Sequence, residues 1–185
     1  MAARHPGPDE PGAPVEPGPH GAPEPRAVHA TCVVLSGRGV LLRGPSGGGK
    51  SDLALRLLDR GARLVADDQT LLSVERNGLI ARAPANTKGL LEVRGVGLIT
   101  VPALSCAAID LVLDLVPPEQ LQRMPDPAAT TRLLGVCVPC WALDPFESSA
   151  PHKVALIVGR SPLGYLSTWL GTGSAVGVAE PLPDA

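Results

Sequence analysis

The sequence predicts one α/β domain with a mixed β-sheet and few helices, and three observations support this. An apolar run at residues 39–43 leads into a glycine-rich loop at 44–51, and a pattern with helical spacing follows at 52–60. Short β-type runs then alternate with turn residues, and Asn77-Gly78 between two of them is typical of a hairpin. A chain of 185 residues has room for one such core and its tails.

The elements are expected in the following order. The loop at 44–51 separates two early strands from the first helix, which a glycine after the last periodic residue should end. The run at 90–101 is apolar but holds two glycines, so we expect an extended segment with a bulge or a close backbone approach. The expected strands are 28–35, 40–43, 63–66, 71–75, 79–83, 109–115, 133–138 and 153–158, with a helix at 52–60 and a loop or short helix at 117–132.

The two ends of the chain differ in composition from its middle. Residues 1–26 consist mainly of Pro, Gly, Ala and charged residues, and such a segment buries too little apolar surface to offset the entropy lost on ordering. We therefore expect a disordered tail at 1–26 and a folded domain at 27–160. The segment 161–185 should hold a short helix at 163–170 and a loose tail.

The composition restricts the classes of partner. The net charge of −2 offers no basic surface for nucleic acid or for an anionic membrane. No stretch is long and apolar enough to cross a bilayer, and no signal peptide is visible at the start. We therefore expect a cytoplasmic protein without nucleic-acid or membrane partners. Its core must be built from Leu, Val, Ile and Ala, because the only aromatic residues are Trp141, Phe146, Tyr165 and Trp169.

The cysteines do not indicate a metal or redox site. Cys137 and Cys140 have CxxC spacing, but a second CxxC pair and a His pair at ligand spacing are missing from the sequence. The pair also lies in an apolar, β-type run and not at the start of a helix. We interpret all four cysteines, Cys32, Cys106, Cys137 and Cys140, as small core residues.

The glycine-rich loop has the spacing of a phosphate-binding P-loop between a strand and a helix. Glycines let backbone N–H groups turn inward around phosphate oxygens, and the first turn of the helix adds unpaired N–H groups. The lysine supplies a charge to the β- and γ-phosphates, and the serine hydroxyl is a ligand for Mg²⁺. The predicted nucleotide-binding residues are Gly44, Pro45, Ser46, Gly47, Gly48, Gly49, Lys50 and Ser51.

Carboxylates after the loop are candidates for the chemistry. Asp67 and Asp68 end the strand that follows the first helix, where strand ends border a ligand crevice. One can hold Mg²⁺ directly or through water, and the other can accept a proton from an attacking hydroxyl. The structural alternative is a solvated turn. Glu92 and Arg94 are two residues apart in an extended run, so they can share one face, either around a metal ion or as a salt bridge.

Taken together, these residues resemble a known family. The set comprises His29, the loop through Ser51, and two stretches, Ala66-Asp67-Asp68 and Leu91-Glu92-Val93-Arg94-Gly95-Val96-Gly97. It resembles the catalytic domain of the HPr kinase/phosphorylase family, the HPr serine kinases, in the short form of alphaproteobacteria.

The resemblance implies a P-loop kinase fold shared with phosphoenolpyruvate carboxykinase. It also implies ATP and Mg²⁺ as cofactors, a serine of an HPr-like phosphocarrier protein as the acceptor, and a ring-like homo-oligomer. In the reverse direction, inorganic phosphate would remove the phosphoryl group as pyrophosphate. By position, Asp68 would take the serine proton in the forward direction and donate one in reverse, and His29 would lie beside it and assist. Lys50 would hold the phosphates, and Ser51 and Glu92 would ligate Mg²⁺. Arg123 is the nearest candidate for a further family arginine.

The sequence departs from the family pattern in two places, and two alternative functions remain open. Residues 1–26 stand where longer members have a separate domain, and 143–153 lacks the basic, glycine-containing segment that the family links to dephosphorylation. The residues therefore favour the kinase direction over the phosphorylase direction. The alternatives are a kinase for a small molecule on the same scaffold and a non-catalytic, ATP-sensing module.

Overall fold

The computed structural model describes residues 24–76 and 78–160, and all structural statements below concern these residues. The expected tail at 1–26 lies almost wholly outside them, as does the short helix expected at 163–170. The elements in chain order are β1 (Arg26–Leu35), β2 (Arg38–Arg43), α1 (Lys50–Leu58), β3 (Arg63–Ala66), β4 (Gln69–Glu75), β5 (Gly78–Arg82), β6 (Leu90–Val93), β7 (Gly97–Thr100), β8 (Ala107–Leu115), a 3₁₀ turn (Pro118–Gln120), β9 (Thr130–Leu133), β10 (Val136–Leu143) and α2 (Ala150–Arg160).

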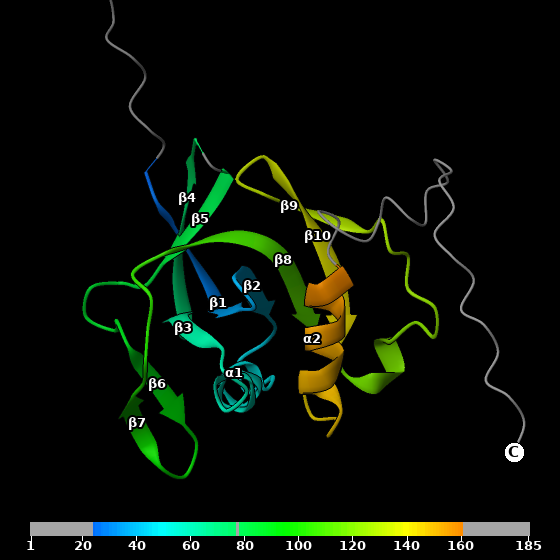
Figure 1. The fold of residues 1–185 in the computed structure, drawn as a ribbon, viewed down its shortest axis with the longest axis horizontal. Coiled ribbons are helices and arrows are strands. Elements are labelled where there is room, and N and C mark those ends of the chain that lie inside the picture. The colour runs from blue at the N-terminus through cyan, green and yellow to red at the C-terminus, as the bar shows by residue number, and fades with distance from the viewer. Residues whose placement is uncertain (1–23, 77, 161–185) are drawn as a thin grey trace, which may run out of the picture.

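The expected α/β fold with a mixed sheet is confirmed. Eight strands form one strongly curved sheet, in the order β2-β1-β4-β5-β8-β10-β9 with β3 paired to β1 (Figure 1). The strand β8 pairs antiparallel with β5 and parallel with both β2 and β10. Because β8 also contacts β2, the pairings of β1, β2, β4, β5 and β8 close into a ring. The strands β6 and β7 form a separate hairpin that projects from the sheet beside α1 (Figure 1).

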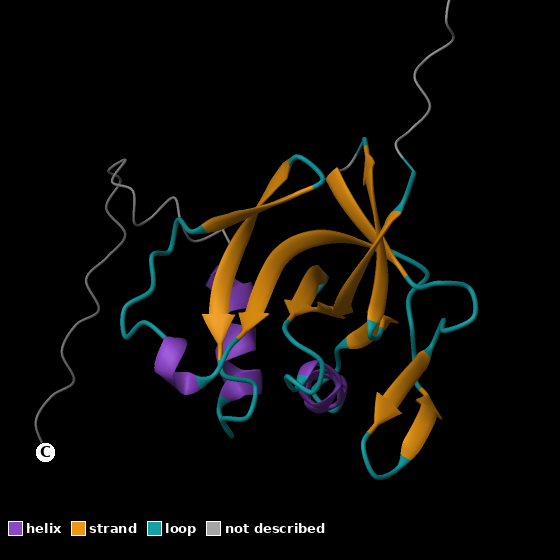
Figure 2. Ribbon diagram, turned by 180° about the vertical axis from the view of Figure 1, so that it is seen from behind, coloured by secondary structure: helices purple, strands orange, loops and turns teal. Residues whose placement is uncertain are grey.

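The helices lie on one side of the curved sheet, as Figure 2 shows from behind. Alternation along β2 explains the two layers of the core: Val40 and Leu42 pack with α1, α2 and Leu91 of β6, whereas Leu41 packs in the second cluster, on the other side of the strand. All of these side chains are buried and aliphatic, as expected for a chain with few aromatic residues. Neither α1 nor α2 is long and apolar enough to cross a membrane.

Strand β2, which leads to the glycine-rich loop, is held from both sides. It pairs antiparallel with β1 and parallel with β8. At its end, Arg43 donates two hydrogen bonds of 2.8 Å to the carboxylate of Asp114 in β8. Such a two-pronged ion pair fixes orientation as well as distance. The loop therefore begins from a firmly positioned strand end.

The prediction of a strand at 153–158 was wrong, because this segment belongs to α2. The run of Lys, Val, Ala, Leu, Ile and Val has the β-branched composition of a strand. Helical spacing becomes visible only when the window starts earlier: Ala150, Val154 and Val158 recur every four residues, and all three are buried. Pro151 also lies in the first turn, where a helix tolerates proline.

The run at 90–101 is two strands and not one bulged segment. The strands β6 and β7 pair antiparallel, with Val93 opposite Gly97. Gly95 and Gly97 have φ values of +82° and +109°, and Val96 donates its N–H to the carbonyl of Val93. The glycines therefore mark a tight turn, which places Glu92 and Arg94 on either side of the last residue of β6.

The interpretation of the cysteines as core residues holds for one of them. Cys32 is fully buried, and burial raises the pKa of its thiol. Cys140 is half-buried, and burial together with a hydrogen bond to Asp114 raises its pKa to about 11. Cys106 and Cys137 are exposed. Among the described residues, no group of three or more His, Cys, Asp or Glu side chains is arranged to hold a metal ion.

Candidate nucleotide-binding site

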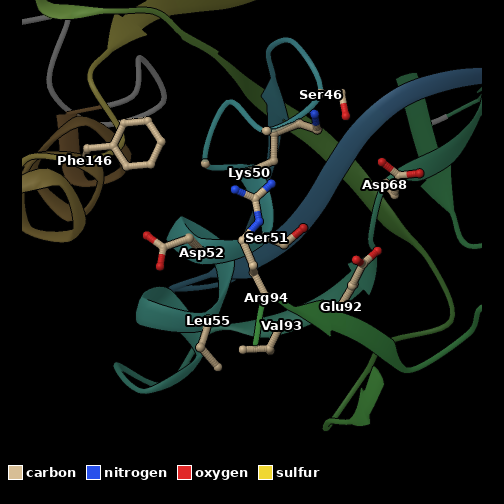
Figure 3. A pocket seen from close by; sticks show the side chains of 12 residues that line it. Ser46, Lys50, Ser51, Asp52, Leu55, Asp68, Glu92, Val93, Arg94 and Phe146 are labelled. Carbon is tan, nitrogen blue, oxygen red and sulfur yellow. The ribbon is translucent and has the colours of Figure 1, made fainter. Parts of the chain in front are cut away.

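The glycine-rich loop joins β2 to α1 and forms one wall of a cleft of about 350 Å³ (Figure 3). Ser46, Gly47 and Gly49 of the loop line it, as do Lys50, Ser51, Asp52 and Leu55 of α1. The rest of the lining comes from Asp68 after β3, from Glu92, Val93 and Arg94 of the β6–β7 hairpin, and from Phe146 before α2. The structure thus brings the predicted loop together with three of the predicted polar side chains.

Lys50 is almost fully buried, and its ammonium has a partner for each of its three hydrogens. Nζ donates to the carbonyl oxygens of Gly44 at 3.1 Å and Pro45 at 2.9 Å, and it lies 2.8 Å from Nε2 of His29. Burial lowers the pKa of Lys50, and the charges of Asp68 and Asp67 oppose that shift.

His29 links Lys50 to Asp68. Its Nδ1 lies 3.2 Å from Oδ1 of Asp68. With Lys50 in its ammonium form, Nε2 is the acceptor, so Nδ1 carries the hydrogen and donates it to the carboxylate. Neither motif spacing nor composition predicted this bridge, since it depends on β1 running past the loop. His29 entered the predicted site only through the family resemblance.

The two neighbouring aspartates have different environments. Asp67 is buried and accepts hydrogen bonds from Thr31 Oγ1 at 2.7 Å, from Ser51 Oγ at 2.9 Å and from the backbone N–H of Glu92 at 3.1 Å. Asp68, in contrast, has a side chain that is 72% exposed. Its φ of +59° turns the chain directly after β3, and Asp tolerates this left-handed conformation better than most residues.

The arrangement around Asp67 leaves Ser51 able to bind a cation. A hydroxyl has one hydrogen and two lone pairs, and the Ser51 hydrogen goes to Asp67. Its oxygen lone pairs are therefore available on the cleft side. Thr31, which orients the same carboxylate, was missed by the sequence analysis. Its signal was a hydroxyl residue within the apolar second half of β1.

Glu92 and Arg94 both line the cleft, and within the described residues they form no ion pair with each other or with any other side chain. The salt-bridge alternative of the sequence analysis is therefore not what the structure shows. The Arg94 guanidinium stands over the loop, because a Cβ built on Gly47 would lie 3.7 Å from its Nη2. The hairpin thus presents one carboxylate and one guanidinium to the same cleft (Figure 3).

The structure does not bring Arg123 to this site. It is exposed in the segment between the 3₁₀ turn and β9, and it is not among the residues that line the cleft. Phe146 and Arg56, in contrast, contribute to the cleft or its support and were not proposed from the sequence. Both lie where the loop and α1 contact the segment before α2, and sequence spacing cannot show such a contact.

The donor set of the cleft fits Mg²⁺. Ser51 and Glu92, which line the cleft, and Asp67, which accepts a hydrogen bond from Ser51, offer only oxygen atoms. Mg²⁺ is usually held by one or two carboxylates, waters and substrate phosphates. Three carboxylates would also repel a triphosphate unless a cation lay between them.

Alanine substitutions at Gly47 and Gly49 test whether the loop needs glycine for its backbone conformation and for its close packing. Both have positive φ, +78° and +73°, but a Cβ on Gly49 would also lie 2.9 Å from Pro145 and 3.2 Å from the Phe146 ring. We expect Gly47→Ala to lower the free energy of unfolding by about 1–2 kcal/mol, the cost of a left-handed residue. Gly49→Ala should lower it further, because the ring and Pro145 must move. Urea unfolding of both variants measures the difference, and equal losses would contradict the observed close packing.

The comparisons with known proteins agree with this geometry. The family model for the HPr Serine kinase C-terminal domain matches residues 22–158. The HPr kinase/phosphorylase of Limosilactobacillus reuteri is 34% identical over 161 residues, covering 79% of this chain and 48% of that protein. The protein of the same name from Clostridium acetobutylicum is 49% identical over 83 residues, covering 45% of this chain and 27% of that protein.

A solved structure, that of the Hpr(Ser) kinase/phosphatase from Coxiella burnetii, shares the fold. It superposes with a TM-score of 0.67 at 32% sequence identity, covering 75% of this chain and 97% of that chain. The chain spans about half the length, or less, of the curated relatives cited here. With the family model matched across most of its described residues, the chain belongs to the HPr serine kinase C-terminal domain family.

Proposed function

We propose that the chain is a Mg²⁺- and ATP-dependent protein kinase that phosphorylates a serine of an HPr-like phosphocarrier protein. The observation that carries the proposal is the shared cleft of Lys50 and Asp68, which His29 bridges at 2.8 and 3.2 Å. A lysine that can bind phosphate and an exposed carboxylate in the same cleft suit the transfer of a phosphoryl group to a hydroxyl. The names of the relatives, HPr kinase/phosphorylase and Hpr(Ser) kinase/phosphatase, support an HPr-like protein as the acceptor.

The proposed reaction assigns one role to each group. The loop N–H groups and Lys50 hold the β- and γ-phosphates, and Lys50 exchanges its carbonyl partners for phosphate oxygens. Asp68 takes the proton of the serine hydroxyl as the serine oxygen forms its bond to the γ-phosphorus. The bond from that phosphorus to the bridging oxygen breaks at the same time, and ADP leaves. His29 donates to Asp68 and keeps its carboxylate directed at the cleft.

The positions of Ser51, Glu92 and Asp67 suit a metal ion between protein and phosphates. Ser51 and Glu92 would hold Mg²⁺ there, and the bound ion would supply positive charge against the negative charge that develops in transfer. Asp67 already accepts hydrogen bonds on both oxygens, so we assign it to orienting Ser51 and to a contact through water. Glu92, with its carboxylate toward the cleft, is the candidate for a direct ligand.

The test is transfer of label from [γ-³²P]ATP to a purified HPr-like protein. We expect Mg²⁺-dependent, acid-stable label on a serine, which mass spectrometry locates. Label on a metabolite but not on protein would support a small-molecule kinase instead. Tight ATP binding without transfer to any acceptor would support a non-catalytic sensor.

The same site is proposed to work in reverse. Inorganic phosphate would attack the phosphoserine phosphorus, the bond to the serine oxygen would break, and Asp68 would return a proton to that oxygen. The products are the HPr-like protein with its serine unphosphorylated and pyrophosphate. Incubating the labelled HPr-like protein with phosphate and measuring pyrophosphate tests this direction separately, since 143–153 departs from the family's dephosphorylation segment.

We further propose a cytoplasmic location and a ring-like homo-oligomer, on the basis of the family. Light scattering behind a sizing column measures the subunit number in solution. A monomer at micromolar concentration would contradict the oligomer without affecting the assignment of the cleft.

A further inference from the structure

A large apolar side chain stands exposed at the edge of the nucleotide cleft. Phe146 lines the cleft and is 67% exposed, although the whole chain has only four aromatic residues. Its ring lies against the glycine loop, since a Cβ on Gly49 would come within 3.2 Å of it. An exposed ring contributes little to the core, and its position at the cleft presents an aromatic face where a bound ligand can contact it.

The segment around Phe146 is held from both sides. Its backbone N–H donates to the buried carboxylate of Asp144 at 2.9 Å. The guanidinium of Arg56 in α1 donates to the carbonyl oxygens of Pro145 and Glu147, the residues on either side. Arg56 also pairs with Asp52 in the first turn of α1. The ring is therefore positioned by the same helix that follows the phosphate loop, as expected for a preorganised binding surface.

The ring lies at the opposite end of the cleft from the reactive groups. In Figure 3, Phe146 and Asp68 are on opposite sides of Lys50, with Asp52 on the side of Phe146. A triphosphate whose terminal phosphate is held by Lys50 near Asp68 must leave its nucleoside at the other end. That end is bordered by the first turn of α1 and by Phe146.

We propose that Phe146 is the stacking surface for the base of the bound nucleotide. This inference rests on the proposed function, because it assumes that the loop holds a nucleoside triphosphate. A flat aromatic face attracts any nucleobase by stacking, and such contacts tolerate different bases. The site therefore takes nucleoside triphosphates without selecting strongly among bases, and Phe146 contributes affinity for the base and none for the phosphates.

Calorimetric titration with Mg²⁺-ATP and with Mg²⁺-tripolyphosphate, which lacks the nucleoside, tests the inference. Phe146→Ala should weaken ATP and GTP binding by about tenfold and leave tripolyphosphate binding unchanged. Phe146→Trp should bind ATP at least as tightly as the wild type. Leu156→Ala removes a comparably exposed side chain from α2, away from the cleft, and should change neither affinity.

The outcomes separate the two proposals. Equal losses for ATP and tripolyphosphate in Phe146→Ala, or no loss for either, would overturn the stacking role. So would a wild type that binds tripolyphosphate as tightly as ATP. A wild type that binds neither ligand would overturn the proposed function and this inference together. A wild type that binds ATP better than tripolyphosphate, but transfers nothing to protein, would overturn the kinase proposal alone.

Discussion

The Asp68→Asn variant is expected to bind ATP like the wild type and to transfer phosphate roughly a thousandfold more slowly. Asn has nearly the shape of Asp, but its amide cannot take the serine proton. The substitution should not disturb the fold, because Asp68 is exposed and Asn also tolerates a φ of +59°. Single-turnover transfer of label to the HPr-like protein, beside ATP titration, measures the two effects separately.

A suitable control for this variant is Asp59→Asn. Asp59 is exposed just after α1, outside the cleft, so the same chemical change there should leave transfer unaffected. Full transfer activity in Asp68→Asn would place the proton acceptor elsewhere. Loss of ATP binding together with transfer would instead give Asp68 a role in holding the nucleotide.

The Lys50→Met variant should lose nucleotide affinity by roughly a hundredfold, the scale of losing charge-assisted hydrogen bonds to phosphate. Met nearly matches the length of Lys but donates nothing, and the carbonyl oxygens of Gly44 and Pro45 would then face the phosphates without a counter-charge. Titration with ATP and with tripolyphosphate should show the same loss for both, unlike the Phe146 variants.

Lys88→Met provides the matched control. Lys88 is exposed before β6, outside the cleft, and its replacement should change neither affinity. Wild-type affinity in Lys50→Met would mean that the loop amides and the metal suffice for binding. The ammonium would then act only in the transfer step.

Local features of the site could be predicted from the sequence, because they depend on neighbouring residues. The loop at 44–51 imposes its own conformation through its glycines, and the helix after it follows from apolar spacing. Separate roles were predicted for Asp67 and Asp68, the two carboxylates that follow β3, and the structure gives them different environments. The sequence could not show which is buried, since that depends on Thr31 in β1 and Ser51 in α1 both pointing at Asp67.

Features that depend on distant segments were missed or misread. The strand predicted at 153–158 is a helix because its buried face begins at Ala150, before the β-branched run. The bridge from Lys50 through His29 to Asp68 needs the path of β1 beside the loop. Phe146 reaches the cleft only because Arg56 and Asp144 fix the backbone around it. The bridge through His29 and the contact of Arg56 with the segment around Phe146 join residues whose separation along the chain carries no periodic signal.

The pairing of β2 with β8 bears on how the protein is synthesised. Arg43 and Asp114 are 71 positions apart, and a Cβ on Gly44 would lie 3.1 Å from the Leu115 side chain. A nascent chain that has left the ribosome only as far as β5 therefore has its phosphate loop without one of the two strands that brace it. Contacts between such distant segments form slowly. The chain should thus become able to bind ATP late in translation, only after β8 has left the ribosome.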